Sequence, residues 1–317
     1  MTSHTDINGR GRRDQEEVAQ VRVFITGASG WIGSAVVDEL LAHGHQVIGL
    51  ARSDASAASI EAKGAEVLRG DLDTLDVIRA GSEAADAVVH LANKHDWANQ
   101  AETNRAERAA VQTIGDALVG TGKPFLVAAG VAGLTPGRAV TEADPNPSHG
   151  PDAPRGGTEN LALEFADRGV VPVSLRFAPT VHGDRDHGFI ALIADADRRA
   201  GTAAYVGDGE QRWAAVHVQD AARAVRLALE QASPGLIVHV VAEEGVPTRA
   251  IAEAIGAFEG LPVASVDPAA AQEHFGFIGM FFGMDLSAES SRTHEVLGWT
   301  PTGPTLLEDI AAGAYRA

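Results

Sequence analysis

Cysteine is absent from the 317 residues, and its absence excludes several kinds of site. A chain without cysteine has no disulfide bond, no thiolate nucleophile and no Cys-ligated metal, and it is typical of a reducing compartment such as the cytoplasm. No apolar run approaches the ~20 residues that cross a bilayer, and residues 1–20 lack the apolar core of a signal peptide. Tyrosine is scarce as well, since the chain holds only Tyr205 and Tyr315.

Basic residues are few relative to acidic ones. The chain has 25 Lys and Arg against 43 Asp and Glu, which gives a formal net charge of −18 at pH 7. Because such a chain repels phosphate backbones and anionic headgroups, we expect neither a nucleic-acid partner nor a membrane partner. Hydrophobic residues make up 45% and charged residues 21% of the sequence, as in soluble globular proteins. The length favours about two domains.

Short apolar runs alternate with segments of helical periodicity. The alternation predicts strands at 21–26, 47–50, 66–68, 87–91, 124–127 and 171–177. It predicts helices between them at 30–43, 56–63, 74–81, 97–119 and 157–168. Strands that alternate with helices at this spacing build a parallel sheet with helices on both faces, which is the doubly wound, Rossmann-type α/β class.

The second half of the chain has shorter elements and longer loops. Helices are expected at 189–200, 219–231, 248–259 and 304–312, with a strand at 236–241. We therefore divide the chain into a flexible tail (1–20), a dinucleotide-binding domain (21–182) and a smaller mixed α/β lobe (183–317). Some elements of this lobe are expected to return to the first domain.

A glycine-rich segment lies between the first strand and the first helix. It reads Gly27-Ala28-Ser29-Gly30-Trp31-Ile32-Gly33. Glycines at this spacing allow a tight turn, and the free N–H groups at the helix start bind a pyrophosphate. We predict that Gly27, Ser29, Gly30, Trp31, Ile32 and Gly33 bind a dinucleotide. A glycine turn required only for packing is the alternative.

The second strand ends at Arg52 and Ser53. NAD sites usually carry Asp or Glu here to accept a hydrogen bond from the ribose 2′-hydroxyl, whereas a guanidinium can bind a 2′-phosphate through two nitrogens. The sequence therefore favours NADP(H) over NAD(H), with Arg52 and Ser53 at the phosphate. Asp54 would support NAD binding if the loop turned differently, and a solvent-facing Arg52 is the simpler alternative.

Further motifs follow in a characteristic order. They are Gly70-Asp71-Leu72, His90-Leu91-Ala92-Asn93, Pro179-Thr180-Val181-His182-Gly183, Gly207-Asp208-Gly209 and Val216-His217-Val218-Gln219-Asp220. Together with the glycine segment, they make residues 21–312 resemble an atypical or extended short-chain dehydrogenase/reductase of the NAD-dependent epimerase/dehydratase branch. The resemblance implies that Asp71 and Leu72 lie beside adenine. It also implies that Leu91, Ala92 and Asn93 line the cofactor near its ribose, with Pro179 and Val181 at the nicotinamide.

The residues expected to carry catalysis depart from that family. Its usual Tyr-x-x-x-Lys pair aligns here with Arg155 and Glu159. Arginine stays protonated and cannot shuttle a proton, but as a fixed cation it can polarise an oxygen. The four-residue spacing would let Arg155 and Glu159 pair on one helix face, which can also be an ordinary salt bridge. His95, beyond the fourth strand, has a suitable intrinsic pKa for a general acid.

The substrate side is rich in apolar residues. Residues 274–284 hold four of the ten phenylalanines, and an apolar wall with few polar groups suits a hydrophobic small molecule better than a sugar nucleotide. Core packing or a dimer contact explains this segment equally well. The predicted substrate residues are Trp97, Val131, His182, Arg212, Trp213, Phe277 and Phe281. No metal site is predicted, because His182 and His187 lack a convincing third ligand.

Three functions are compatible with these features. The first is an NADPH-dependent reductase that transfers a hydride to a C=N group or an activated C=O or C=C group of an apolar small molecule. The second is a non-catalytic NADP(H)-binding sensor or regulatory protein, which would explain the altered catalytic residues directly. The third is a sugar-nucleotide epimerase or dehydratase, whose chemistry depends most on the missing tyrosine. A homodimer is expected by analogy with this fold.

Overall fold

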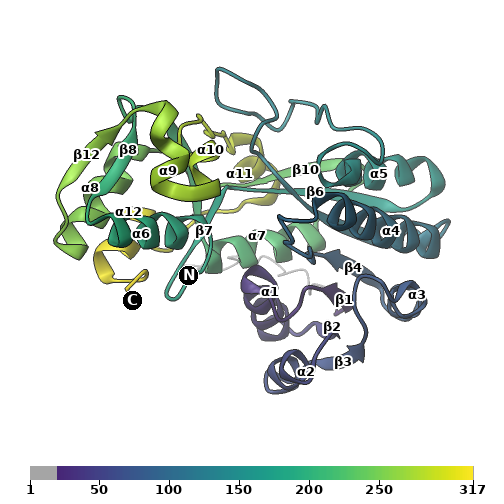
Figure 1. The fold of residues 1–317 in the computed structure, drawn as a ribbon. Coiled ribbons are helices and arrows are strands. Elements are labelled where there is room, and N and C mark those ends of the chain that lie inside the picture. Colours follow the sequence, from purple (N-terminus) through teal and green to yellow (C-terminus); the bar gives the residue numbers. More distant parts are fainter. Residues whose placement is uncertain (1–19, 317) are drawn as a thin grey trace, which may run out of the picture.

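The computed structural model describes residues 20–316, and its centre is a seven-stranded parallel sheet (Figure 1). The strand order is β10-β6-β5-β4-β1-β2-β3. The strands are β1 (Arg22–Thr26), β2 (Gln46–Ala51), β3 (Glu66–Arg69), β4 (Ala87–His90), β5 (Pro124–Gly130), β6 (Val171–Phe177) and β10 (Leu236–Val240). This order confirms the predicted doubly wound α/β class, because the connections leave β1 toward β3 on one side and toward β6 on the other.

Helices cover both faces of this sheet. One face carries α1 (Trp31–Ala42), α2 (Asp54–Glu61) and α7 (Val218–Glu230), and the other carries α3 (Leu75–Ala84), α4 (Gln100–Leu118) and α5 (Thr158–Glu164). Successive residues of β1 point to opposite sides: Val23 and Ile25 pack under α1, whereas Phe24 packs under α3 and α4. Strands buried on both faces are continuously apolar, which is why these short runs were predictable.

The predicted elements agree with the structure except at some ends and in the second half. Helix α4 begins at Gln100 rather than at residue 97, because residues 91–99 form a loop. The helix expected at 157–168 ends at Glu164 and continues as a 3₁₀ turn, Phe165–Arg168. Most of the tail expected at 1–20 lies outside the described residues.

The C-terminal part builds a second core. It contains the sheet β11-β9-β7 and the strand pair β12-β8, none of whose strands the sequence predicted. The strands are β7 (Thr180–His182), β8 (Ala203–Val206), β9 (Arg212–His217), β11 (Glu243–Pro247) and β12 (Val263–Val266). The helices are α6 (Phe189–Ala200), α8 (Thr248–Glu259), α9 (Ala271–Phe275), α10 (Gly279–Phe282), α11 (Ser291–Leu297) and α12 (Leu306–Ala312). Within this part, β10, α7 and α11 pack into the first core.

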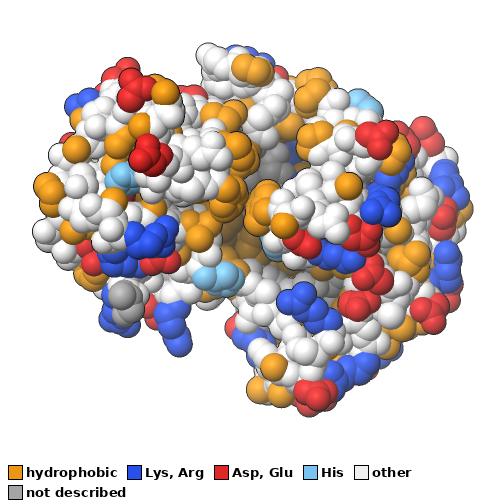
Figure 2. All heavy atoms as spheres, viewed as in Figure 1, with side chains coloured by type: hydrophobic (Ala, Val, Ile, Leu, Met, Phe, Trp, Pro, Cys, Tyr) orange, Lys and Arg blue, Asp and Glu red, His pale blue; other side chains and the backbone are white. Residues whose placement is uncertain are grey.

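The space-filling view shows a hollow between the two halves of the molecule (Figure 2). Hydrophobic side chains border it on the side of the C-terminal part. In open α/β sheets, ligands bind at the carboxyl ends of the strands, next to the point where the strand order reverses. Within residues 20–316, no helix is long and apolar enough to cross a membrane.

Candidate functional site

The turn between β1 and α1 has the geometry of a diphosphate cradle. Gly27 has a left-handed backbone (φ 75°), and a Cβ atom there would lie 2.8 Å from the backbone nitrogen of Ala92. A Cβ atom on Gly33 would lie 2.0 Å from the carbonyl oxygen of Gly27. The N-cap of α1 is Gly30, no side chain caps the helix, and its first turn carries no acidic residue. The uncapped N–H groups and the helix dipole therefore suit an anion, and these residues fit a dinucleotide.

The carboxyl ends of β2 and β3 bring two arginines close together in the backbone register. Ala51 pairs in register with Arg69, and Arg52 follows Ala51 in the chain. Arg52 is exposed and makes no ion pair within residues 20–316. Arg69 Nη2 lies 2.5 Å from Asp54 Oδ1. Asp54 is thus held by a cation, and Ser53 caps α2 by accepting a hydrogen bond from the Ser56 backbone N–H.

The loops after β3 and β4 contain the residues that the resemblance assigns to adenosine. Asp71 Oδ1 accepts hydrogen bonds from the backbone N–H groups of Asp73 and Thr74, and Leu72 is buried. The N–H of Leu91 bonds to the Thr26 carbonyl oxygen, and that of Ala92 bonds to Thr26 Oγ1. The loop after β4 is therefore fixed against the end of β1, beside the glycine turn.

The nicotinamide end of the predicted site is tied to the same turn. The Trp31 indole N–H donates to the carbonyl oxygen of Val181 at 2.7 Å, and the Trp31 ring packs edge-on against His187. Pro179 is half-buried between β6 and β7. The structure thus brings Trp31 and Val181, which are 150 residues apart, into direct contact.

The expected pairing of Arg155 with Glu159 is wrong. Arg155, Gly156 and Gly157 all have left-handed backbones (φ 53°, 63° and 62°), and α5 begins only at Thr158. The i,i+4 geometry of a helix therefore does not extend back to Arg155. Its guanidinium instead bonds to both carboxylate oxygens of Glu107 on α4.

Glu107 is a site residue that the sequence did not reveal. Its side chain has no exposed surface, and it accepts hydrogen bonds from Arg155 and from Asn93 Nδ2 at 2.6 Å. A buried carboxylate with two donors holds them in one geometry. Arg155 keeps an exposed part, so its remaining N–H groups are available to a ligand.

Glu159, by contrast, belongs to the core. Glu159 Oε1 accepts from Arg176 Nε at 2.7 Å and from Ser174 Oγ at 2.9 Å, and Glu159 Oε2 accepts from Asn146 Nδ2. Both members of the Glu159–Arg176 pair are buried. The partners of the Glu159 carboxylate thus lie in β6 and in the loop before α5.

His95 lies close enough to Arg155 and Glu107 to be influenced by their charges. Its backbone is left-handed (φ 51°), its N–H donates to Asn93 Oδ1 at 2.7 Å, and its ring centre lies 6.4 Å from that of Trp97. Burial lowers the pKa of His95, the charge of Arg155 lowers it further, and Glu107 opposes the shift. Near neutral pH this histidine is therefore mainly uncharged.

An aromatic wall faces His95 from the C-terminal part. Trp97 packs against Phe277 with ring centres 5.3 Å apart, and Phe277 contacts Phe281 and Phe189. Phe189 stacks on Phe281. Because Phe189 opens a helix far from the Phe-rich segment in sequence, only the fold reveals that it belongs to this wall.

Several predicted substrate residues lie elsewhere. Trp213 has no exposed surface and donates its indole N–H to the Met284 carbonyl oxygen. His182 is fully buried, with Nδ1 2.6 Å from Asp309 Oδ2, and Val131 packs in the core of the sheet. Arg212 is exposed at the start of β9, near the Gly245 carbonyl oxygen. The structure does not bring Trp213, His182 and Val131 to the surface of the hollow.

Comparison with known proteins agrees with this geometry. Residues 23–242 match the model of the NAD dependent epimerase/dehydratase family. The chain belongs to this family. The uncharacterized protein C2A9.02 of Schizosaccharomyces pombe is 40% identical over 296 residues, which are 93% of this chain and 100% of that protein.

More distant relatives in the epimerase/dehydratase family carry functional names. One is the 4-hydroxy-2-methyl-3-oxo-4-farnesyl-3,4-dihydroquinoline-1-oxide ketoreductase of Stigmatella aurantiaca, 27% identical over 72% of this chain and 70% of that protein. Among solved structures, MoeE5 in complex with UDP-glucuronic acid and NAD has a TM-score of 0.70 and 26% identity, covering 92% of this chain and 97% of that one. The predicted resemblance is confirmed, and with it a nicotinamide-dependent, oxidoreductase-type enzyme.

Proposed function

We propose that this protein is an NADPH-dependent reductase of a small apolar molecule with a C=N group or an activated C=O or C=C group. The observation that carries the proposal is the position of Arg155. Glu107 fixes this guanidinium near His95 at the carboxyl edge of the sheet, and an aromatic wall lies opposite. A cation, a titratable imidazole and an apolar surface thus meet beside a dinucleotide cradle.

The preference for NADPH rests on the corner formed by β2 and β3. Arg52 follows the register partner of Arg69, and the carboxylate of Asp54, two residues after Arg52, already pairs with Arg69. Two guanidinium groups favour a 2′-phosphate, whereas a ribose 2′-hydroxyl would require a free carboxylate.

Arg155 and His95 have separate roles in the proposed reduction. Bound NADPH supplies a hydride to the electrophilic carbon. Arg155 polarises the C=O or C=N group and stabilises negative charge that develops on its heteroatom. His95, which is mainly uncharged at neutral pH, takes up a proton from solvent and transfers it to that heteroatom, so hydride and proton together complete the reduction. The nitrogen of an imine also takes a proton readily from solvent, so it places less demand on His95.

The names of the relatives support an apolar carbonyl compound. The Stigmatella relative is named for a ketone on a ring that also bears a farnesyl chain, and a Stenotrophomonas maltophilia relative is named a 2-alkyl-3-oxoalkanoate reductase. Both names describe ketones that carry a hydrocarbon group. The aromatic wall formed by Trp97, Phe277, Phe281 and Phe189 is compatible with such a part.

Titration calorimetry with NADPH and NADH tests the cofactor. We expect NADPH to bind more tightly, and Arg52→Ala to weaken NADPH by about 10- to 100-fold with little change for NADH, because it removes a charge-assisted contact. Lys123→Ala, on the opposite edge of the sheet, is the control. Equal affinity of the wild-type protein for both cofactors would contradict the preference.

Turnover of cyclic imines, ketones and enones, followed by NADPH absorbance, tests the reaction. Tight NADPH binding without turnover of any of them would favour the second function, a non-catalytic sensor, for which the burial of Glu159 at the usual lysine position is the supporting observation. The cytoplasmic location and the homodimer stay predictions.

A further inference from the structure

The loop between β4 and α4, residues 91–99, holds a strained residue next to the proposed site. His95 has a left-handed backbone (φ 51°), which is uncommon outside glycine but which histidine adopts more often than most residues. Such a conformation persists only where surrounding contacts hold it, and these residues often lie at functional sites. The question is therefore which contacts hold this loop.

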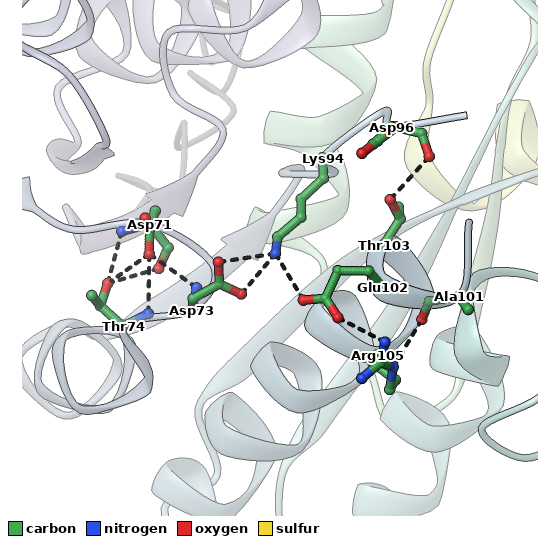
Figure 3. A network of polar contacts seen from close by, with 9 residues as sticks. All are labelled: Asp71, Asp73, Thr74, Lys94, Asp96, Ala101, Glu102, Thr103 and Arg105. Carbon is green, nitrogen blue, oxygen red and sulfur yellow. Dashed lines mark hydrogen bonds and ion pairs between the residues drawn. The ribbon is translucent and has the colours of Figure 1, made fainter. Parts of the chain in front are cut away.

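Lys94 connects this loop to two other segments (Figure 3). Its Nζ lies 2.8 Å and 2.9 Å from the two carboxylate oxygens of Asp73, in the loop after β3, and 3.3 Å from Glu102 Oε1, in the first turn of α4. Hydrogen bonds to Asp73 raise the pKa of Lys94, so it stays a cation. Glu102 is held in turn by Arg105.

The segments that Lys94 connects are themselves held by hydrogen bonds to the backbone. The Asp73 N–H donates to Asp71 Oδ1, within the loop that the resemblance assigns to adenine. On the other side, Thr103 Oγ1 donates to the Asp96 carbonyl oxygen, and Asp96 Oδ1 accepts from the N–H groups of Ala98 and Asn99. Lys94 therefore joins two loops at the sheet edge, directly before His95.

The tip of the same loop reaches the other half of the molecule. Trp97 is 52% exposed, yet its ring packs against Phe277. Residues 94–97 thus form a strap, with Lys94 at one end near the adenosine side and Trp97 at the other end on the aromatic wall. His95 lies between the two attachments.

We propose that Lys94 is a positioning residue: its bridge from Asp73 to Glu102 holds residues 94–97, so that His95 faces Arg155 and Trp97 faces the aromatic wall. The inference rests on the proposed function for the role of His95, but not for the geometry of the strap. An ordinary lysine ion pair at the surface would have neither effect, since such pairs contribute little.

The test compares Lys94→Met with Lys63→Met. Lys63 also forms an ion pair, with Asp38, but it lies in the α2–β3 turn away from the strap. Acrylamide quenching of tryptophan fluorescence reports Trp97 selectively, because Trp213 and Trp299 are buried and Trp31 is half-buried. The Trp97→Phe variant gives the background to subtract.

Loss of the bridge should free the strap. In Lys94→Met we expect the quenching of Trp97 to rise about twofold and kcat to fall about tenfold, since small displacements of a catalytic group are costly. The pKa of His95, followed by NMR of the ring carbons, should move up toward its ordinary value as burial is relieved. Lys94→Arg should keep the quenching of Trp97, kcat and the pKa of His95 near their wild-type values, and Lys63→Met should change none of these three.

The outcomes separate the two proposals. If Lys94→Met matches Lys63→Met in quenching and in the His95 titration, Lys94 positions nothing and the inference is overturned. If both readouts change but His95→Ala keeps full kcat, the strap stands and His95 is not the proton donor. If both readouts and kcat change together and His95→Ala is inactive, the two proposals are supported jointly.

Discussion

Left-handed glycine turns precede two helices, α1 and α5, and the two turns have different roles. Before α1, Gly27 is left-handed and Gly33 approaches its carbonyl oxygen; before α5, Gly156 and Gly157 are left-handed, and a Cβ on Gly156 would lie 2.7 Å from the Asn104 carbonyl oxygen. The first turn leaves the helix N-terminus open for a ligand. The second turn instead packs against α4 and directs Arg155 to Glu107. The same glycine geometry thus opens one helix N-terminus and packs the other against a neighbouring helix.

The largest effect on cofactor binding should follow from closing the first turn. Gly33→Val places atoms on the Gly27 carbonyl oxygen, so we expect NADPH affinity to fall at least about 100-fold, because the turn must open and lose its aligned N–H groups. Titration calorimetry measures the affinity, and circular dichroism shows whether the fold persists. Ser34→Ala, one residue along the same helix, should bind NADPH normally. A well-folded Gly33→Val protein with unchanged affinity would refute the cradle.

The next prediction is that Glu159 contributes to stability and not to cofactor binding. Glu159→Ala leaves Arg176 buried without its carboxylate, so we expect the free energy of unfolding to fall by about 3–5 kcal/mol. Urea denaturation measures this loss. Exposed Glu61→Ala should change stability little. NADPH affinity at low temperature should stay within about threefold of wild type, since Glu159 does not contact the cradle. Loss of cofactor affinity without loss of stability would return Glu159 to the site.

For Arg155, in contrast to Glu159, the expected effect is on turnover. Arg155→Met should lower kcat by about 100-fold, the usual effect of removing one electrostatic stabiliser. Arg155→Met also leaves the buried Glu107 carboxylate without its cation, so urea denaturation should show a loss of stability as well, and kcat is compared at a temperature at which both proteins are folded. Arg79→Met, which removes an exposed guanidinium on α3, is the control for charge and should keep the kcat of wild type. Equal kcat in the two variants would show that the second turn positions no catalytic group.

A smaller effect concerns His90, which connects the two regions. It bonds to Thr26 below the glycine turn, and burial and then the charge of Arg155 lower its pKa to about 3. Between pH 6.5 and about 3, His90 is protonated in the unfolded state but not in the folded state. Its full contribution to the free energy of unfolding is therefore present above pH 6.5. As the pH falls below 6.5, the free energy of unfolding decreases by up to about 1.4 kcal/mol per pH unit. Unfolding of His90→Gln should show a shallower slope from pH 6.5 to 5. Identical slopes would assign the acid sensitivity to other groups.

The sequence predicted the cofactor half well because its signals are local. A buried parallel strand is apolar along its whole length, and a tight turn needs glycine, so β1 to β6 and the Gly27–Gly33 cradle can be recognised without any knowledge of distant contacts. The strands of the C-terminal part were missed because they are short and pair with distant segments: β8 pairs with β12, about 60 residues further along the chain.

What the sequence determined by itself is the fold class, the cofactor cradle and the absence of a tyrosine at the start of α5. What only the tertiary structure decided is which side chains meet. The left-handed turn at residues 155–157 prevents the helical pairing and brings Arg155 to Glu107, and the packing of α6 brings Phe189 to the aromatic wall. These contacts join segments 48 or more residues apart, and a periodic pattern carries no information at that separation.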